Sequence, residues 1–300
     1  MKIRKTGGDV MLIEQKLEEI KLTSAQQTVA QYLLDKRSTI ECMTIHELAK
    51  QTYTSTATII RLAKKLGYNG YQELKDDFLK EIHYLDTHFN NINPNYPFDP
   101  NDNIQKIAVK VSVLEKETIE DTLTLIDHDS LQNAVWTMKK SRQIHLCAIS
   151  YCLLLGQMFK LDMMRIGVSV NICDLSGDEL FLPALADKED CVIFISYSGQ
   201  IDKLCLLAKQ VKKQGAKVIV ISALGNNELK KYADSVLNIS TREKLLSKVK
   251  GYANEVSIKL ILDILYSCFF AIEYQRNNEK RIEISKFAET SSYSTKRNST

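Results

Sequence analysis

Hydrophobic and polar positions follow different patterns in the two halves of this chain. Before residue 90, apolar residues recur with the spacing of amphipathic helices, as in the stripe formed by Val29, Ala30, Leu33 and Leu34 after Leu22-Thr-Ser24. After residue 104, short continuous apolar runs alternate with helical patterns. We therefore expect an all-α N-terminal region followed by an α/β region.

Three consecutive segments of the first half predict a helix-turn-helix. Thr44-Ile-His-Glu47 matches a capping box and begins a short helix. Thr52–Ser55 interrupts that helix, and Thr56–Leu66 forms the next one, which Gly67 ends. A helix, a short turn and a second helix in this order are typical of the motif.

The second half predicts one parallel sheet covered by helices on both faces. Five apolar runs predict buried strands: Arg142–Ile149, Val168–Cys173, Cys191–Ser196, Ala216–Ser222 and Ser235–Ile239. Helical patterns fill most of the gaps, at Leu153–Ile166, Glu179–Leu185, Ile201–Gln214 and Glu228–Ala233. A helix over Ile104–Leu125 leads in, and a long helix over Tyr252–Tyr274 follows. The alternation implies right-handed crossovers and a flavodoxin-like five-stranded α/β sandwich.

Three of the four prolines fall between residues 90 and 103, among several Asn and Asp residues. This composition breaks helices and favours a linker. We expect four parts: a helix-turn-helix domain over residues 1–88, a linker over 89–103, an α/β domain over 104–280 and a polar tail over 281–300. The last ten residues are expected to lack regular structure.

Composition and charge argue against a secreted, membrane-spanning or disulfide-rich protein. The net charge of +3 over 300 residues is too small to indicate nucleic-acid binding by itself, so any basic surface must be local. Residues 1–8 lack the apolar core of a signal peptide, and the apolar run Ile258–Ile272 is short for a membrane span and carries two charges. Seven cysteines without CxxC spacing predict reduced core thiols. We expect a cytoplasmic protein without a metal site, a cofactor or a disulfide framework.

Basic charge is concentrated on the second helix of the predicted motif. No Asp or Glu occurs between Leu48 and Gln72, whereas four basic residues do. Apolar positions of that helix share one face: Ile59, Leu62, Ala63 and Leu66. The other face predicts contacts with DNA bases and phosphates by Ser55, Thr56, Thr58, Arg61, Lys64 and Lys65. The other interpretation is an ordinary solvent-exposed helix face.

A second candidate site follows the strand Cys191–Ser196. The turn after a buried parallel strand is where open α/β sheets bind ligands. Here it offers Ser196, Ser198 and Gly199, followed by the free N–H groups of a helix N-terminus. These groups suit an anion such as a phosphate.

Several runs of the first half resemble the N-terminal domain of the RpiR family of bacterial transcriptional regulators. They are Leu22-Thr-Ser24, Thr44–Ala49, Thr58–Arg61 and, most specifically, Lys65-Leu-Gly-Tyr-Asn-Gly-Tyr-Gln-Glu-Leu-Lys75. The second half is similar to the sugar isomerase (SIS) domain of that family, through Leu161–Gly167, Ile195–Gly199, Gly215–Ser222 and Tyr232–Asp234. The SIS resemblance implies a sugar phosphate at the C-terminal ends of the strands, bound by Ser196, Ser198, Gly199 and Gln200, with Ser222 lining the same crevice.

The chain departs from the family pattern at its turns. Tyr53-Thr-Ser55 replaces the Gly-Val-Ser of the helix-turn-helix, and Leu62 replaces a phenylalanine. In the first turn of the SIS domain, Ala148-Ile-Ser-Tyr-Cys152 replaces Gly-x-Gly-x-Ser. Both glycines are lost, and Cys152, a weak donor, stands where the family has the contacting serine. Ser150 is the candidate for compensating this loss.

The resemblance implies a DNA-binding regulator of sugar or amino-sugar metabolism, active as a homodimer or homotetramer on double-stranded operator DNA and modulated by a phosphosugar. Alternatives are a phosphosugar isomerase, a regulator whose SIS domain serves only dimerisation, and a phosphosugar-binding module that does not touch DNA. Isomerisation needs a positioned base. Glu243, Glu255 and His145 are available by type, but we expect Glu243 in a solvated loop and His145 in a structural role. We therefore expect no enzyme.

Overall fold

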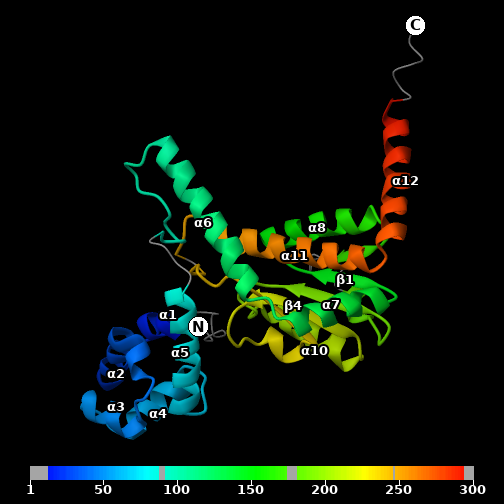
Figure 1. Cartoon of the computed structure of the whole chain (residues 1–300). Coiled ribbons are helices and arrows are strands. Elements are labelled where there is room, and N and C mark those ends of the chain that lie inside the picture. The colour runs from blue at the N-terminus through cyan, green and yellow to red at the C-terminus, as the bar shows by residue number, and fades with distance from the viewer. Residues whose placement is uncertain (1–12, 88–91, 174–180, 246, 294–300) are drawn as a thin grey trace, which may run out of the picture.

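The computed structural model describes residues 13–87, 92–173, 181–245 and 247–293, and its N-terminal part is entirely helical (Figure 1). The helices are α1 (Ile13–Glu19), α2 (Ser24–Lys36), the 3₁₀ helix η1 (Arg37–Ile40), α3 (Ile45–Gln51), α4 (Thr56–Lys65) and α5 (Tyr71–Thr87). The expected capping box at α3 is present, because Thr44 and Glu47 bond each other's backbone N–H groups. The helices enclose their own core, which includes Leu33, Leu48 and Phe78.

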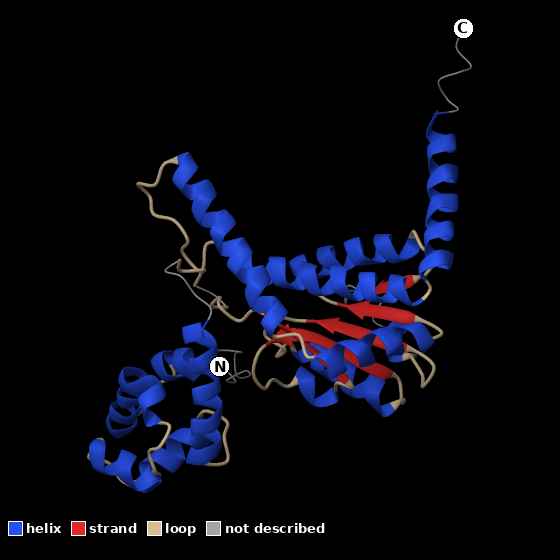
Figure 2. Cartoon of the chain, in the orientation of Figure 1, coloured by secondary structure: helices blue, strands red, loops and turns tan. Residues whose placement is uncertain are grey.

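The second part is the expected parallel α/β sandwich (Figure 2). Its strands are β1 (Ile144–Cys147), β2 (Val170–Cys173), β3 (Cys191–Ile195), β4 (Lys217–Ala223) and β5 (Ser235–Ile239), in the order β2-β1-β3-β4-β5. One face packs against α7 (His128–Lys140), α8 (Ser150–Met164) and α11 (Tyr252–Ile272). The other face packs against α9 (Phe181–Ala184), α10 (Asp202–Lys213) and η3 (Leu229–Tyr232). Five of the seven cysteines are buried within these layers, as expected of core thiols.

Several boundaries differ from the expectation. Helix α6 (Ile104–Thr124) is as predicted, but α7 was not predicted, and the segment expected as a helix at Glu228–Ala233 forms only the 3₁₀ turn η3. The helix expected at Glu179–Leu185 is described only as α9, since residues 174–180 lie outside the described part of the chain.

The last ten residues were expected to lack regular structure, and this expectation is wrong for residues 291–293, the three of them that the structure describes. Helix α12 (Tyr274–Tyr293) spans them and projects from the body of the molecule (Figure 1). Charged and amide pairs one turn apart stabilise it, as between Lys280 and Glu283 and between Gln275 and Glu279. A polar composition therefore does not prevent a helix here, and residues 294–300 lie outside the described range.

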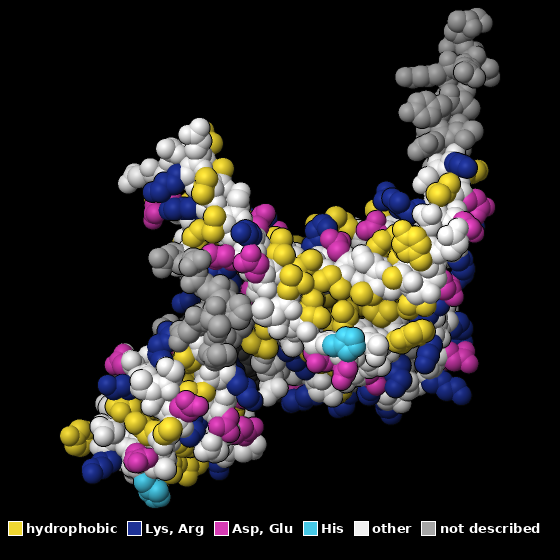
Figure 3. Space-filling view, viewed as in Figure 1, with side chains coloured by type: hydrophobic (Ala, Val, Ile, Leu, Met, Phe, Trp, Pro, Cys, Tyr) yellow, Lys and Arg dark blue, Asp and Glu magenta, His cyan; other side chains and the backbone are white. Residues whose placement is uncertain are grey.

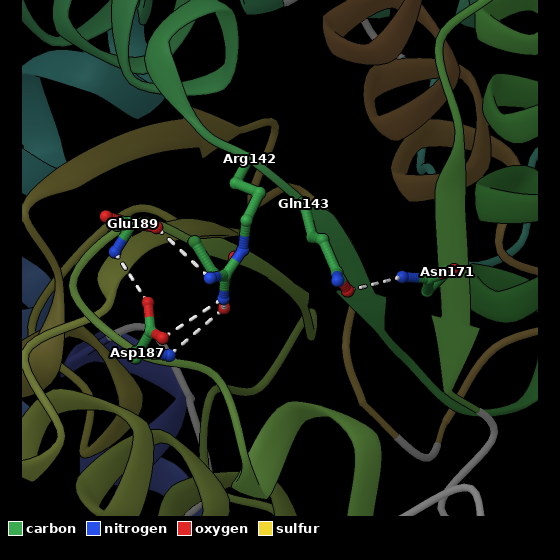
Figure 4. A network of polar contacts seen from close by, with 6 residues as sticks. Arg142, Gln143, Asn171, Asp187 and Glu189 are labelled. Carbon is green, nitrogen blue, oxygen red and sulfur yellow. Dashed lines mark hydrogen bonds and ion pairs between the residues drawn. The ribbon is translucent and has the colours of Figure 1, made fainter.

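The N-terminal edge of the sheet is joined by a polar network (Figure 4). Arg142, just before β1, bonds Asp187 at 3.0 Å, Glu189 at 3.1 Å and the buried Asp190 at 2.9 Å, all just before β3. This network lies at the opposite edge of the sheet from the candidate ligand turn, and its exposed members stabilise the fold only modestly. None of the helices in the described ranges has both the length and the apolar character needed to cross a bilayer.

Candidate functional site

Two turns meet where the strand order of the sheet reverses. Strand β1 pairs with β2 on one side and with β3 on the other, so the chain leaves the two neighbouring strands β1 and β3 in opposite directions along the sheet. Ligands of open α/β sheets bind at this position, outside the carboxyl ends of the strands. The turns that follow β1 and β3 are Ala148–Cys152 and Ser196–Gln200, the two segments singled out from the sequence.

Each of these turns leads into a helix whose N-terminus lacks a side-chain cap. Helices α2, α3, α4, α6 and α7 each have a capping side chain that accepts a bond from a backbone N–H. Helices α8 and α10 have no such bond, because their N-cap positions are occupied by the apolar residues Ile149 and Ile201. Their first N–H groups and the positive ends of their dipoles therefore favour an anion at this edge of the sheet.

The Ser196–Gln200 turn is held by its own serines. Ser196 Oγ accepts a bond from Gly199 N at 3.0 Å, and Ser198 Oγ accepts one from Gln200 N at 3.3 Å. Because both hydroxyl oxygens act as acceptors, each retains its hydrogen for donation to another group. Ser196 is 2% exposed and Ser198 9% exposed, whereas Gln200 is half-buried. The turn thus offers donors from its side chains as well as from its backbone.

Gly199 needs to be glycine for two reasons. Its φ is +60°, and a Cβ built on it would lie 2.2 Å from Cγ and Oδ1 of Asn227. The Asn227 amide donates to Ser222 Oγ at 2.8 Å, and Ser222 Oγ is 3.4 Å from the carbonyl oxygen of Tyr197. Ser222 is fully buried, so its hydroxyl connects Asn227 to the backbone of the turn from below.

The Ala148–Cys152 turn adopts a backbone that glycine would favour. Ser150 has φ +54° and is exposed, at one of the two positions where the sequence lacks an expected glycine. Cys152 is buried, and the backbone N–H of Tyr197 faces its thiol, so the two turns are in contact. Burial raises the pKa of Cys152 to about 11, which keeps the thiol neutral at pH 7. Of this turn's candidate residues, only Ser150 reaches the surface.

The expectation that Glu243 belongs to a solvated loop is wrong. Its side chain is fully buried, it accepts a bond from Ala253 N at the start of α11, and it pairs with Lys248 at 3.0 Å. Burial raises the pKa of Glu243, and the Lys248 ammonium opposes this rise. Its backbone carbonyl accepts a bond of 2.5 Å from the Tyr197 hydroxyl. The polar run around it gave no signal of burial, because only the packing of the turn and α11 over the loop removes it from water. His145 is buried within β1.

The candidate DNA interface lies on α4, and its two faces divide as predicted. The four apolar residues expected to face inward are buried: Ile59, Leu62, Ala63 and Leu66. Arg61 and Lys64 are exposed, and within the described ranges neither is paired with an acidic side chain. Thr56 and Thr58 are half-buried near the start of the helix.

Two of the predicted DNA-binding residues already have partners within the domain. Ser55 is the N-cap of α4, where its hydroxyl oxygen accepts a bond from Thr58 N at 3.2 Å. The Lys65 ammonium donates to the carbonyl oxygen of Lys21, between α1 and α2. Arg61 and Lys64 are therefore the exposed basic side chains of α4 that have no hydrogen-bond or ion-pair partner among the described residues.

Family models match both parts of the chain. Residues 10–83 match the family model described as a helix-turn-helix domain of the rpiR family, and residues 137–263 match the SIS domain. The chain is an RpiR-family protein. An uncharacterised HTH-type transcriptional regulator of Haemophilus influenzae is 26% identical over 82% of this chain and 85% of its own length. Another, from Clostridium perfringens, is 24% identical over 88% of this chain and 94% of its own length.

A solved structure shares the fold of this RpiR-family chain over most of its length. The Vibrio vulnificus NanR protein, complexed with ManNAc-6P, superposes with a TM-score of 0.58 at 20% identity, covering 92% of this chain and 98% of its own. At this identity the likeness establishes the fold alone.

The RpiR-family turn between α3 and α4 contains a strained residue, Tyr53. Its φ is +50° and its side chain is 96% exposed, so packing contributes little to holding it. Tyr53→Gly is expected to raise the free energy of unfolding by about 0.5–1 kcal/mol, because glycine adopts this backbone without strain. Urea unfolding measures the change. Tyr53→Ala is the control, and an equal gain with alanine would contradict the backbone explanation.

Proposed function

We propose that this RpiR-family protein is a transcriptional regulator that binds operator DNA through α4 and whose operator affinity is changed by a phosphosugar at the Ser196–Gln200 turn. The observation that carries the proposal is the pair of uncapped helix N-termini at the strand-order reversal, in a chain that also has a basic helix-turn-helix. The curated relatives named as transcriptional regulators and the NanR complex with ManNAc-6P support it.

The chemistry of the turn suits a phosphate ester of a polar molecule. The N-termini of α8 and α10 favour the charge, and the hydrogens of Ser196 and Ser198 are available to phosphate oxygens. The exposed Ser150 and half-buried Gln200 lie at the rim, where they can bond sugar hydroxyls. A monosaccharide phosphate fits these groups better than an apolar ligand does.

DNA recognition through one short helix implies an assembly with two such helices. Exposed apolar side chains on α8 recur at helical spacing, at Leu154, Met158 and Leu161. Figure 3 shows a wider apolar area on the visible face of the α/β part. Helices α6 and α12 also project from the body with exposed Ile104 and Phe287 (Figure 1). A homodimer covers such surfaces and places two α4 helices on a near-palindromic operator.

In this proposal the ligand acts by linkage rather than by chemistry. A phosphosugar that binds one arrangement of the domains more tightly shifts the population toward it, by no more than its differential affinity. The named relatives are regulators, so we propose a non-catalytic SIS domain in a cytoplasmic protein. An isomerase would instead convert hexose or pentose phosphates, which a turnover assay of the full chain detects.

Ser198→Ala tests the ligand site. We expect ManNAc-6P binding to weaken by about tenfold, because a charge-assisted hydrogen bond contributes about 1.5–3 kcal/mol and the support of Gln200 N is also lost. Isothermal titration calorimetry measures the affinity, and a gel shift measures operator binding without ligand. The control is Ser112→Ala, an exposed serine on α6 whose hydroxyl donates to the Ala108 carbonyl and to no other described residue. Unchanged ligand affinity in Ser198→Ala would contradict the assignment of this turn.

A further inference from the structure

The loop between β5 and α11, described at residues 240–245 and 247–251, contacts the candidate ligand turn. Tyr197 stands between Ser196 and Ser198 in the sequence of the turn. Its hydroxyl donates to the Glu243 carbonyl oxygen at 2.5 Å. The Lys248 ammonium lies 5.2 Å from the centre of the Tyr197 ring and pairs with Glu243 at 3.0 Å. Tyr197 and Glu243 are buried and Lys248 is half-buried, so a change in the position of Tyr197 must be transmitted to the loop or accommodated by breaking these bonds.

The same loop binds the segment that connects the two domains. Asn95 is 7% exposed, and its side-chain oxygen accepts a bond of 2.6 Å from Lys244 N. Its backbone carbonyl accepts a second bond, of 2.9 Å, from Val249 N. The neighbouring Tyr96 hydroxyl is 2.8 Å from Ser247 Oγ. The connecting segment is therefore bonded to the loop at three positions.

A third set of contacts fixes the loop to α6, the first helix of the SIS part. Arg242 pairs with Glu117 at 3.0 Å, and both side chains are more than nine-tenths buried. Ser240 N donates to Ser257 Oγ at 2.9 Å, and Ser257 Oγ lies 2.7 Å from Thr122 Oγ1. Separating the buried ion pair of Arg242 and Glu117 would leave two buried charges unpaired, which strongly destabilises a protein. We therefore expect α6 and this end of the loop to move together.

We propose that the β5–α11 loop couples the ligand turn to the DNA-binding domain, with Asn95 as the residue through which the loop positions the connecting segment. The inference rests on the proposed function, because it names the route by which a ligand at Ser196–Gln200 changes operator affinity. A ligand that reshapes the turn shifts Tyr197, the loop follows Tyr197, and Asn95 follows the loop. The connecting segment follows α5 along the chain after residues 88–91, which lie outside the described range, and in this proposal the position of α4 changes with it.

Asn95→Ala tests the connection on the linker side. Asn95 contacts neither the ligand turn nor α4, so ManNAc-6P affinity by calorimetry and operator affinity without ligand are expected to match the wild type. The ratio of operator Kd with and without ManNAc-6P is expected to fall to within about twofold of one. Asn101→Ala, at an exposed position of the same segment, is the matched control. An Asn95→Ala variant with the full wild-type ratio overturns the proposal.

A ligand-independent measurement separates this inference from the proposed function. Tyr197→Phe removes the bond to Glu243, and amide hydrogen exchange at Lys244 and Val249, the two donors to Asn95, is expected to become at least about fivefold faster. Tyr232→Phe, which removes a hydroxyl bonded to Glu228 elsewhere, should leave these amides unchanged. Unchanged exchange in Tyr197→Phe overturns the coupling. If the wild type does not bind ManNAc-6P but Tyr197→Phe shows the faster exchange, the choice of ligand fails and the physical connection stands.

Discussion

Arg61→Ala is expected to lower operator affinity by at least about 30-fold while leaving the fold intact. Arg61 is exposed on the outward face of α4 and unpaired with acidic side chains in the described chain, so its removal costs no packing. A bidentate arginine contact to guanine is worth about 1–3 kcal/mol, and a two-fold dimer loses it twice. A salt-titrated gel shift measures the loss, and circular dichroism checks the fold.

The control for Arg61→Ala is Lys213→Ala, which removes an exposed basic residue of α10, outside the helix-turn-helix and outside the helices proposed to form the dimer. It should leave operator affinity unchanged. If Arg61 binds phosphate rather than a base, the slope of log affinity against log salt falls by about one for each phosphate that is no longer neutralised, and all sequences weaken alike. Unchanged affinity at every salt concentration would contradict the assignment of α4 as the recognition helix.

Gly199→Ala is expected to destabilise the protein by about 2–4 kcal/mol and to abolish the phosphosugar binding that we propose for this turn. The new methyl group would combine the strain of a positive φ with overlap against Asn227, whose amide holds Ser222 and the carboxyl end of β4. Either the turn or Asn227 must move, and both lie at the proposed ligand site. Urea unfolding and calorimetry measure the two effects.

Gly225→Ala separates strain from overlap. Gly225 also has a positive φ, of +94°, but no atom lies within 4 Å of a Cβ built on it. It should therefore cost about 1 kcal/mol, the strain alone. Adding Asn227→Ala to Gly199→Ala should recover part of the stability, because the two side chains no longer overlap. Equal destabilisation by Gly199→Ala and Gly225→Ala would show that the overlap with Asn227 is unimportant.

Patterns within single segments predicted the elements that local physics controls. The apolar stripe of Ile59, Leu62, Ala63 and Leu66 predicted which face of α4 is buried, because helical periodicity fixes which side chains share a face. Unbroken apolar runs predicted all five strands, because strands buried on both faces tolerate few polar residues. The capping box at Thr44 likewise depends only on residues three apart.

The candidate ligand site was predictable in part. The Ser196–Gln200 turn combines hydroxyls, glycine and a helix start within one short segment, so its chemistry is visible in the sequence. The absence of side-chain caps on α8 and α10, and their meeting at the reversal of strand order, depend on how the strands pair. The need for Gly199 depends on Asn227, which follows a different strand.

By itself the sequence determined the helix-turn-helix, the parallel sheet and the chemistry of the turn after β3, since each arises from neighbours along the chain. Only the tertiary structure decided that Glu243 is buried, that Lys65 bonds Lys21, and that Asn95 joins the connecting segment to the β5–α11 loop. The physical reason is that burial and pairing of a polar side chain depend on which distant segments pack over it. A polar residue has the same appearance in the sequence whether it ends in water or beneath a helix.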